Sequence, residues 1–246
     1  MSFCNHVAIT RFLKSQIPRV VNRDRGILLD IGCGVQPYRS IYADSFKKVI
    51  AADFDVRSRI DVRIDVHALP LRDESCSVVL LTEVIEHLAE VKIALVEVCR
   101  VLRTDGYLFL TWPFLYPLHE LPHDFARYTE FGMQHLLEGT GLRIEALYRR
   151  GDMLCVVFGI LEQFVFGLVE FLSRLPVISH LGSRLLKPLL RRFFIAAWSL
   201  YFTLIRNAER FQPIIAGANL KGPANHLALW TMGYCARVRK VKESLP

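Results

Sequence analysis

The stretch from Ile27 to Tyr38 constrains the fold more than any other part of the chain, because its pattern predicts a strand that runs into a glycine turn. Its first residues, ILLDI, form a short apolar run without helical period, which is typical of a strand covered on both faces of a parallel sheet. Gly32 and Gly34 follow, and they let the backbone turn sharply and approach a ligand closely. Asp30, at the strand end, can accept hydrogen bonds from a cationic or hydroxylated ligand. The stretch therefore predicts the entrance to a nucleotide pocket.

The residues that follow indicate a ribose but no pyrophosphate in this pocket. A dinucleotide fingerprint carries a third glycine three residues after the second, whereas this chain has Pro37 there and no further glycine until Gly106. A second strand, residues 49–52, ends at Asp53, at about the twenty-residue offset where an acid meets ribose hydroxyls. We therefore expect a ligand that carries a ribose without a diphosphate.

Several motifs in a fixed order resemble the class I S-adenosylmethionine (SAM) dependent methyltransferases, in particular small bacterial proteins of the type 11 family with a DIGCGxxPY motif. The motifs are DIGCGVQPY at 30–38, Asp65 followed by LPLRDES, TEVIEHL at 82–88, LRTDGYLFLTWP at 102–113 and PHDFARYT at 122–129. The resemblance implies an α/β fold: a Rossmann-like seven-stranded class I methyltransferase sheet with a helical insert before the last strand. It also implies SAM as the cofactor.

The resemblance further implies which residues bind the cofactor. They are Asp30, Gly32, Cys33, Gly34, Tyr38, Asp53, Phe54, Asp65, Val66 and Glu83. Asp65 and the backbone amide of Val66 would read the adenine edge, and the alternative for Asp65 is a solvated loop acid. Glu83 follows a buried strand at 77–82, which delivers it to the carboxyl end of the sheet.

The remaining elements are predicted from periodicity and turn residues. They are a helix over 5–21 interrupted at Pro18, a helix from Pro37 to about Phe46, a third strand over 61–66, a helix after Glu83 closed by Gly106, a fifth strand over 107–111, a helix over 131–140 and a strand over 142–149. Glu86 and His87 should open the helix that follows Glu83. His87 is then either a group that orients others near the methyl-transfer centre or a packed histidine.

The segment from Trp112 to Thr129 is rich in proline and aromatic residues and follows the fifth strand, where loops carry function. An acceptor hydroxyl must lose its proton as it attacks the methyl group, and a histidine or an aspartate can take that proton. The catalytic candidates are His123, Asp124, His119 and Arg127. The alternative is that Asp124 and Arg127, three residues apart, form a structural ion pair that holds the loop.

Residues 151–228 are predicted as an insert between the core (1–150) and a final segment (229–246) whose last strand is Thr231 to Val238. The insert contains two apolar stretches, 154–175 and 193–205, and basic residues lie between them. Neither stretch reaches the roughly twenty uncharged residues that a spanning helix requires. The pattern favours association in the plane of an anionic membrane surface, through Phe193, Phe194 and Trp198 among others. The alternative is a cap buried against the fold or a homodimer partner.

The composition indicates that some of the apolar residues serve a binding partner and not only the core of the fold. The chain is 52% hydrophobic with a net charge of +7, and its mean hydropathy is +0.28. Because the basic residues are interleaved with apolar runs, a nucleic-acid partner is disfavoured. The six cysteines form no metal-binding cluster, so no metal is expected, and they indicate a reducing compartment. The N-terminus lacks the pattern of a signal peptide, which favours the cytoplasm, at the inner face of the membrane.

These patterns predict methyl transfer from SAM, to oxygen rather than carbon, on a small-molecule or lipid-linked acceptor. The resemblance suggests a glycan precursor. Two alternatives stay open: a C- or O-methyltransferase of a lipid quinone, and a SAM-binding membrane scaffold without turnover.

Overall fold

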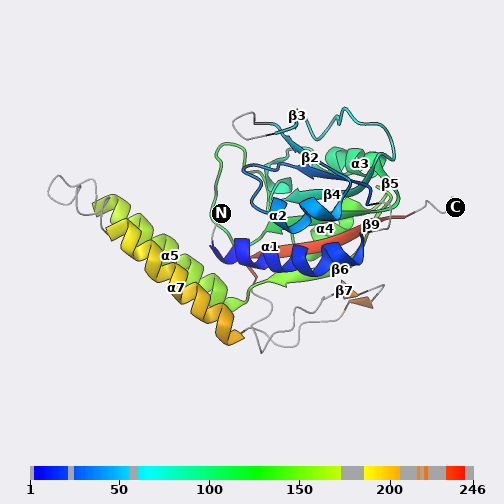
Figure 1. Ribbon diagram of the computed structural model, residues 1–246. Coiled ribbons are helices and arrows are strands. Elements are labelled where there is room, and N and C mark those ends of the chain that lie inside the picture. The colour runs from blue at the N-terminus through cyan, green and yellow to red at the C-terminus, as the bar shows by residue number, and fades with distance from the viewer. Residues whose placement is uncertain are drawn as a thin grey trace.

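The computed structural model describes residues 3–21, 25–55, 60–172, 186–205, 215–216, 219–220 and 231–241. They form a layered α/β core from which a pair of long helices projects (Figure 1). The helices at Arg39–Tyr42 and Val91–Val101 are in the core, and the projecting pair falls in the predicted insert. Within the predicted insert, residues 173–185, 206–214, 217–218 and 221–228 lie outside the described residues.

One mixed sheet organises the core, in the order β3-β2-β1-β4-β5-β9-β6-β7-β8. Its strands are β1 Ile27–Ile31, β2 Lys48–Asp53, β3 Val62–Arg63, β4 Cys76–Thr82, β5 Leu102–Pro113, β6 Leu142–Arg150, β7 Ile215–Ala216, β8 Asn219–Leu220 and β9 Gly233–Lys240. β3, β2, β1, β4 and β5 pair in parallel, and β9 lies antiparallel between β5 and β6. The predicted seven-stranded Rossmann-like sheet is confirmed, with the two-residue strands β7 and β8 added at its edge.

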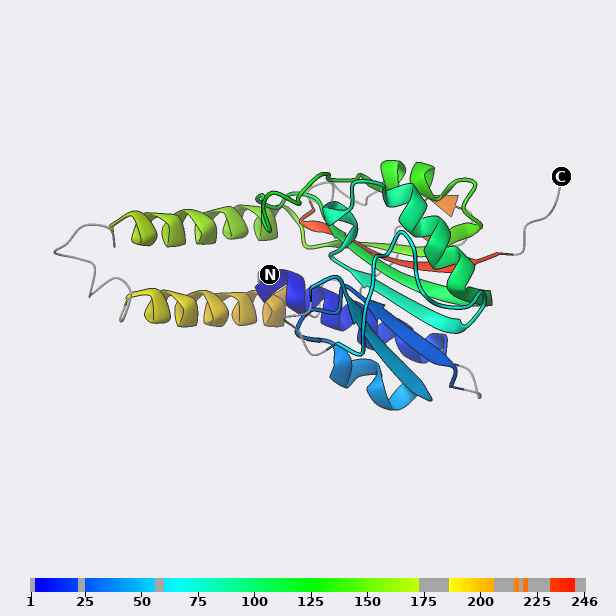
Figure 2. The same ribbon diagram turned by 90° about the horizontal axis from the view of Figure 1, so that it is seen from above.

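The central strands β1 and β4 are largely apolar and almost fully buried because helices cover both faces of the sheet. Successive side chains alternate between the faces, so Leu28 packs with α1 (Phe3–Gln16) and α2 (Arg39–Tyr42), whereas Leu29 packs with α3 (Val91–Val101) and α4 (Glu130–Leu137). Figure 2 shows these two helical layers on opposite sides of the strands. α1 ends at Gln16 and continues as a 3-10 turn over Ile17–Arg19, as Pro18 predicts.

Several predicted boundaries are wrong. The helix expected from Pro37 to Phe46 is four residues of α2 and a 3-10 turn, Ala43–Ser45, and the third strand is two residues long. Ile85–His87 is a 3-10 turn, and α3 begins only at Val91. Gly106 does not cap α3, since that helix ends at Val101 and Gly106 lies within β5.

The hairpin, which we define as α5 (Met153–Leu172) and α7 (Lys187–Ile205), extends away from the sheet (Figures 1 and 2). Its base is anchored by Phe194 and Trp198, which are buried with Cys155 and Met232. Phe194 and Trp198 are therefore not membrane contacts, contrary to expectation. The expectation that neither stretch is apolar enough to span a membrane is also wrong for α5, which qualifies by length and composition alone, with a mean hydropathy of 2.0.

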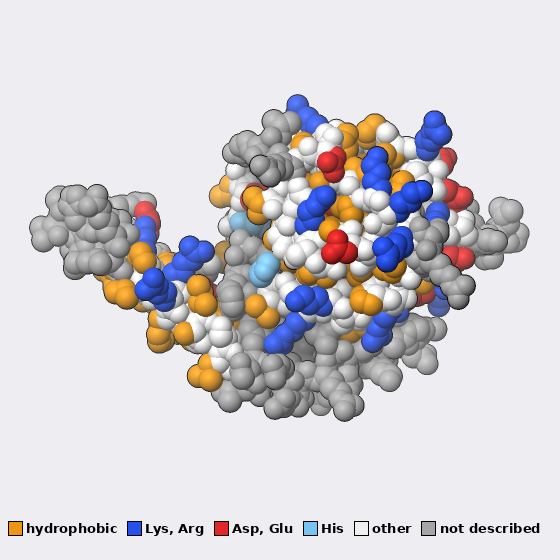
Figure 3. Space-filling model, in the orientation of Figure 1, with side chains coloured by type: hydrophobic (Ala, Val, Ile, Leu, Met, Phe, Trp, Pro, Cys, Tyr) orange, Lys and Arg blue, Asp and Glu red, His pale blue; other side chains and the backbone are white. Residues whose placement is uncertain are grey.

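Beyond its base, the hairpin carries a long series of exposed apolar side chains. They are Leu154, Val157, Leu161, Phe164, Leu168 and Phe171 on α5, and Leu189, Phe193 and Leu200 on α7. Figure 3 shows hydrophobic side chains on the projecting hairpin together with some Lys and Arg, and further Lys and Arg spread over the core. The hairpin therefore presents an apolar surface that the rest of the described chain does not cover.

Candidate active site

A cavity of about 790 Å³ opens at the carboxyl ends of β1 and β4, where open α/β sheets bind their ligands. Its volume lies within the range of small-molecule sites. Its walls come from the glycine turn, the ends of β4 and β5, α1 and the hairpin. The lining residues are Asn5, His6, Gly32, Cys33, Gly34, Val35, Pro37, Tyr38, Thr82, Glu83, His87, Tyr116, His119, Glu120, Glu162, Gln163, Phe166, Arg191 and Ile195.

The glycine turn forms one wall of the cavity, as predicted. Gly32 and Gly34 have φ values of 66° and 51°, in the left-handed region that favours glycine. A Cβ atom on Gly32 would meet Val84 Cγ2 at 2.4 Å, whereas one on Gly34 would meet no described atom within 4 Å. The space beside Gly34 is therefore open to a ligand. Asp53 holds this turn, since its Oδ2 accepts a hydrogen bond from the Gly34 amide at 2.8 Å.

Asp30 does not line the cavity, although it was predicted to bind the ligand. Alternation along β1 places its side chain on the face of Leu28, under α2, where the Tyr42 hydroxyl donates a hydrogen bond to Oδ2. Burial raises the pKa of Asp30 to about 6, against the opposing effect of the Tyr42 hydrogen bond, and Asp53 raises it further. Asp30 thus supports the turn from below.

Four other predicted cofactor residues, Asp53, Phe54, Asp65 and Val66, also lie outside the cavity lining in the described structure. Phe54 is exposed, and the Arg63 guanidinium lies 5.0 Å from its ring centre. Asp65 accepts hydrogen bonds from the His67 amide and from its ring, which lower the pKa of the carboxyl. Val66 packs in the core on the α3 side. Asp65 has the position of a solvated loop acid, which was the alternative to adenine recognition, because 59% of its side chain is exposed.

Glu83 lies in the cavity wall and is held by a buried network. Thr111 Oγ1 donates to its Oε1 at 2.9 Å, and Arg150 Nη2 forms an ion pair with it at 3.0 Å. Arg150 is fully buried and also donates to the Trp112 carbonyl. The backbone of Glu83 has a φ of 54°, which is uncommon outside glycine and concentrates at functional sites. Sequence reasoning missed Arg150, because it lies far from Glu83 along the chain.

The loop after β5 contains the predicted catalytic residues, and only His119 of the four lines the cavity. Asp124 is completely buried, and Arg127 pairs with both of its oxygens at 2.5 and 2.8 Å. This pairing holds the pKa of Asp124 well below its usual range. His123 is exposed beside Phe125, and its carbonyl accepts from His87 Nδ1 at 2.6 Å. Asp124 and Arg127 thus have the geometry of the structural ion pair that was the alternative to a catalytic role.

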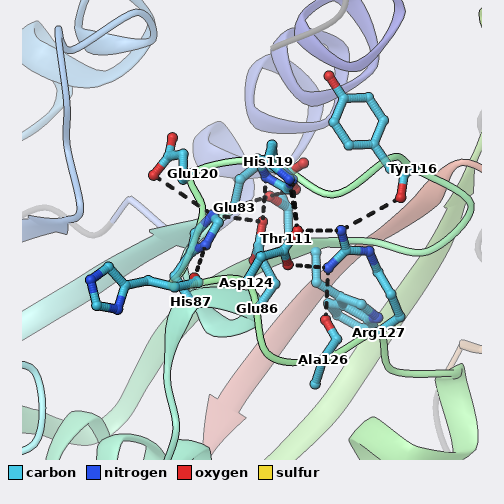
Figure 4. A network of polar contacts seen from close by, with 12 residues as sticks. Glu83, Glu86, His87, Thr111, Tyr116, His119, Glu120, Asp124, Ala126 and Arg127 are labelled. Carbon is cyan, nitrogen blue, oxygen red and sulfur yellow. Dashed lines mark hydrogen bonds and ion pairs between the residues drawn. The ribbon is translucent and has the colours of Figure 1, made fainter.

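A further group, which the sequence did not reveal, lies beside His119 (Figure 4). Glu86 is fully buried, and neither carboxylate oxygen has a hydrogen-bond partner in the described structure. His87 Nε2 lies 3.7 Å and His119 Nε2 lies 3.8 Å from Glu86 Oε1. Burial, and next the nearby Glu83 carboxylate, raise the pKa of Glu86 well above its usual value. The local motif EVIEH gives a signal for Glu86 and His87, but His119 joins them only through folding.

Part of the chain is similar in sequence to known methyltransferases. Residues 29–110 match the family model described as a methyltransferase domain. A probable S-adenosylmethionine-dependent methyltransferase of Mycobacterium tuberculosis (strain H37Rv) is 36% identical over 106 residues, which cover 39% of this chain and 38% of the relative. The chain spans 38% to 54% of the length of the curated relatives it matches. Residues 29–110 form a SAM-dependent methyltransferase domain.

Solved structures support the fold of this methyltransferase domain and of the segments around it. The [4+2]-cyclase SpnF is similar with a TM-score of 0.55 at 18% identity, over 96% of this chain and 82% of SpnF. A SAM dependent methyltransferase from Archaeoglobus fulgidus is similar with a TM-score of 0.53 at 14% identity, over 96% of this chain and 94% of its own. The predicted class I fold is confirmed, and the match to a methyltransferase domain supports the predicted family over residues 29–110. The family match ends at residue 110, so it does not include the loop after β5 or the hairpin.

Proposed function

We propose that the whole chain transfers a methyl group from SAM to an oxygen atom of a membrane-associated acceptor. The observation that carries this proposal is the shape of the cavity. The methyltransferase domain contributes the glycine turn on one side, and the base of the apolar hairpin contributes Glu162, Gln163, Phe166 and residues of α7 on the other. A cofactor on the turn would face an acceptor that arrives along the hairpin.

Chemistry requires two things of such a site, and the cavity offers both. The acceptor oxygen must lie in line with the sulfonium methyl, and binding both substrates in one cavity would supply that placement. The oxygen must also lose its proton. His119 lies in the wall with His87 and Glu86 beside it, so the proton can leave through this group rather than through Asp124, which is ion-paired.

The hairpin favours a membrane over a second copy of the chain as its partner. The exposed apolar residues of α5 lie at positions 153, 154, 157, 160, 161, 164, 168 and 171, and they form one broad apolar stripe rather than a narrow coiled-coil seam. A coiled-coil seam is flanked by charged residues that select the partner, whereas the only charged residues of α5 are Glu162 and Glu170. Glu162 accepts from the Trp198 indole, and Glu170 pairs with Lys187, so both serve contacts to α7. This arrangement supports the proposal that the hairpin lies in the membrane interface, and we propose the cytoplasmic face as its place.

Two chemical classes of acceptor suit the cavity and the hairpin. A lipid-linked glycan precursor and a lipid quinone both combine a polar group with a long apolar chain, as this cavity and hairpin would require. A SAM-binding scaffold without turnover is the rival outside enzymes. The likeness to a [4+2]-cyclase shows that this fold does not by itself determine the reaction.

The test of activity is incubation of the purified chain with methyl-labelled SAM and fractionated cell extract. We expect label in the lipid or lipid-linked glycan fraction, and calorimetry should detect SAM binding. Label confined to RNA or protein would contradict the acceptor class. Binding of NAD in place of SAM would contradict the proposed cofactor.

The test of the membrane partner is flotation of the full chain with vesicles that contain anionic lipid. We expect the wild type to float, and Phe164, Phe171 and Phe193, which are 62% to 65% exposed, to carry the binding. Their combined substitution by Ser should leave the protein at the bottom, because each exposed phenylalanine that enters lipid contributes about 1.5 to 3 kcal/mol.

A matched control substitutes three exposed apolar residues of the core, Ile93, Val96 and Phe131, by Ser. This variant should float like the wild type. If the wild type stays at the bottom as a dimer and the hairpin variant becomes a monomer, the hairpin is an oligomer interface and the membrane proposal fails.

A further inference from the structure

We propose that Glu86, His87 and His119 form a binding site for one divalent transition-metal ion, with Zn²⁺ as the best fit. Each residue offers one ligand atom, and the three atoms lie within 4.8 Å of one another. The group sits at the wall of the cavity, since His87 and His119 both line it. Figure 4 shows the three side chains converging from the turn after β4 and the loop after β5.

The spacing of the ligand atoms is close to that of a metal site. Glu86 Oε1 lies 3.7 Å from His87 Nε2 and 3.8 Å from His119 Nε2. Ligands on one tetrahedral zinc ion, with bonds of about 2.0 to 2.1 Å, stand roughly 3.3 to 3.4 Å apart. The two Glu86–histidine separations are therefore about 0.4 Å too wide, and the widest separation in the group, at most 4.8 Å, would have to close by up to about 1.4 Å for all three atoms to bind one ion. The ring planes of His87 and His119 are inclined by 77°, with centres 4.8 Å apart, so the two rings do not stack.

The buried Glu86 carboxylate lacks the hydrogen-bond donors that a buried acid normally requires. Its side chain is fully buried, and no described residue donates a hydrogen bond to either oxygen. An unpartnered buried carboxylate is costly unless it takes up a proton or coordinates a metal ion. The raised pKa of Glu86 expresses the same cost. A metal ion would supply the missing partner for the ionised form.

Both histidines are held in the tautomer that a metal ligand needs. His87 Nδ1 donates to the His123 carbonyl at 2.6 Å, which leaves the lone pair of Nε2 available on the side of Glu86. His119 Nδ1 lies 3.2 Å from Asp124 Oδ2 and 3.2 Å from the Pro117 carbonyl, so its Nε2 is likewise available. Histidine ligands almost always donate their second ring N–H to a carboxylate or a backbone carbonyl in this way. The ion pair of Asp124 with Arg127 would then fix the orientation of His119.

The donor set selects the ion. Two imidazoles and one carboxylate suit Zn²⁺, whereas Mg²⁺ and Ca²⁺ prefer oxygen ligands throughout. Three protein ligands also leave a coordination position open, as in catalytic zinc sites. Glu120, whose Oε2 lies 3.9 Å from His87 Nε2 and whose side chain is 75% exposed, stands beside the group and could close that position.

The role of the ion, unlike its binding, rests on the proposed methyl transfer. An acceptor hydroxyl that coordinates the ion at the open position would become more acidic. With the ion bound, Glu86, His87 and His119 act as ligands and no longer take the proton. The oxygen releases its proton to solvent and forms the new O–C bond, while the S–C bond of SAM breaks and leaves a neutral thioether. The site would thus favour acceptors whose reacting hydroxyl can bind a metal ion, such as a catechol or a vicinal diol.

The test is calorimetric titration of the metal-free full chain with Zn²⁺, together with Co²⁺ as a coloured probe of coordination. We expect one equivalent to bind and the melting temperature to rise on binding. Glu86→Gln and His119→Ala should each weaken Zn²⁺ binding at least tenfold and change the Co²⁺ spectrum. His135→Ala is the matched control, because His135 is an exposed histidine of α4 paired with Glu138.

Glu86→Gln keeps the shape of the side chain, so its metal-free form should fold at least as stably as the wild type. If His119→Ala does not fold, His87→Ala replaces it. Failure of the wild type to bind Zn²⁺ or Co²⁺ saturably, or equal binding by the wild type and the Glu86 variant, would overturn the site. SAM binding to the metal-free chain is measured in parallel, so that loss of the metal site and failure of the proposed methyl transfer are told apart.

Discussion

Replacing Asp124 by Ala should destabilise the fold rather than remove a proton acceptor. The carboxylate is completely buried, and it accepts hydrogen bonds from both Nη atoms of Arg127 and from the His119 amide at 2.9 Å. Its pKa is held well below the usual range, first by the Arg127 hydrogen bonds. A carboxylate with such a low pKa is a poor general base near neutral pH. The pair instead holds the loop, because Arg127 also donates to the Pro117 carbonyl at 3.3 Å.

The expected loss in free energy of unfolding depends on the charge that each substitution leaves unpaired. Breaking a buried ion pair by removing one partner costs about 3 to 5 kcal/mol, because the other charge stays uncompensated. The Arg127 side chain is 20% exposed and can recover some hydration, so we expect about 2 to 4 kcal/mol for Asp124→Ala. Arg127→Met should cost a similar amount. The double variant should lose less than the sum of the two, with a coupling energy of about 2 to 3 kcal/mol.

Urea unfolding of the metal-free protein measures these free energies, and SAM affinity measured alongside should change little. His135 and Glu138 provide the control, since they form a pair at the same i, i+3 spacing with side chains 83% and 71% exposed. Their substitution by Ala should change the free energy of unfolding by less than about 0.5 kcal/mol. Wild-type stability of Asp124→Ala combined with a hundredfold loss of turnover would refute the ion-pair reasoning and make Asp124 the base.

Two further predictions concern the first strand and its turn. Folding raises the pKa of Asp30 from 3.8 to about 6, so the fold favours the protonated acid and loses stability as the pH rises from about 4 to 6. Asp30→Asn can still accept the Tyr42 hydrogen bond, so its free energy of unfolding should equal that of the wild type at pH 4 and exceed it by about 1 to 3 kcal/mol at pH 7.5. Melting experiments at the two pH values measure this difference, and a difference that does not vary with pH would contradict the prediction. Gly34→Ala and Gly139→Ala both place a Cβ at positive φ in open space, so each should lose about 1 to 2 kcal/mol of stability. Only Gly34→Ala should also lose SAM affinity in calorimetry, because Gly34 lines the cavity.

The central strands could be predicted from sequence because burial on both faces leaves a direct mark. β1, β2 and β4 are mostly apolar runs with an acid or a threonine at or next to their carboxyl ends, and their predicted bounds differ from the structure by no more than a residue. The start of α3 could not be predicted in this way. The apolar period of that helix extends back through Ile85 and Leu88, but Ile85 is buried by a 3-10 turn and Leu88, which is partly buried, follows that turn in extended backbone. Asp105, with φ at 64°, takes the left-handed position that we expected Gly106 to occupy.

The candidate site was predicted where it is local in sequence and missed where folding brings distant segments together. Gly32 and Gly34 lie where the motif indicates, because the turn is made by adjacent residues. Asp30 turns away, because the face that a strand residue takes depends on the sheet and not on its motif. His119 meets Glu86 across two loops, and no periodicity reports such a contact.

The turn after β4 explains why Glu86 is buried without a partner. The Glu83 amide donates to the Thr111 carbonyl, and the left-handed φ of Glu83 redirects the chain into the 3-10 turn at 85–87. That turn directs Glu86 inward and leaves His87 at the cavity wall. A strained backbone, an unpartnered carboxylate and a fully buried arginine, Arg150, thus lie around the same few residues. Each of these features lowers stability, and proteins retain such costs mainly at functional sites. Their convergence beside the cavity is therefore an argument, independent of any resemblance, that the chemistry of this protein takes place at the end of β4.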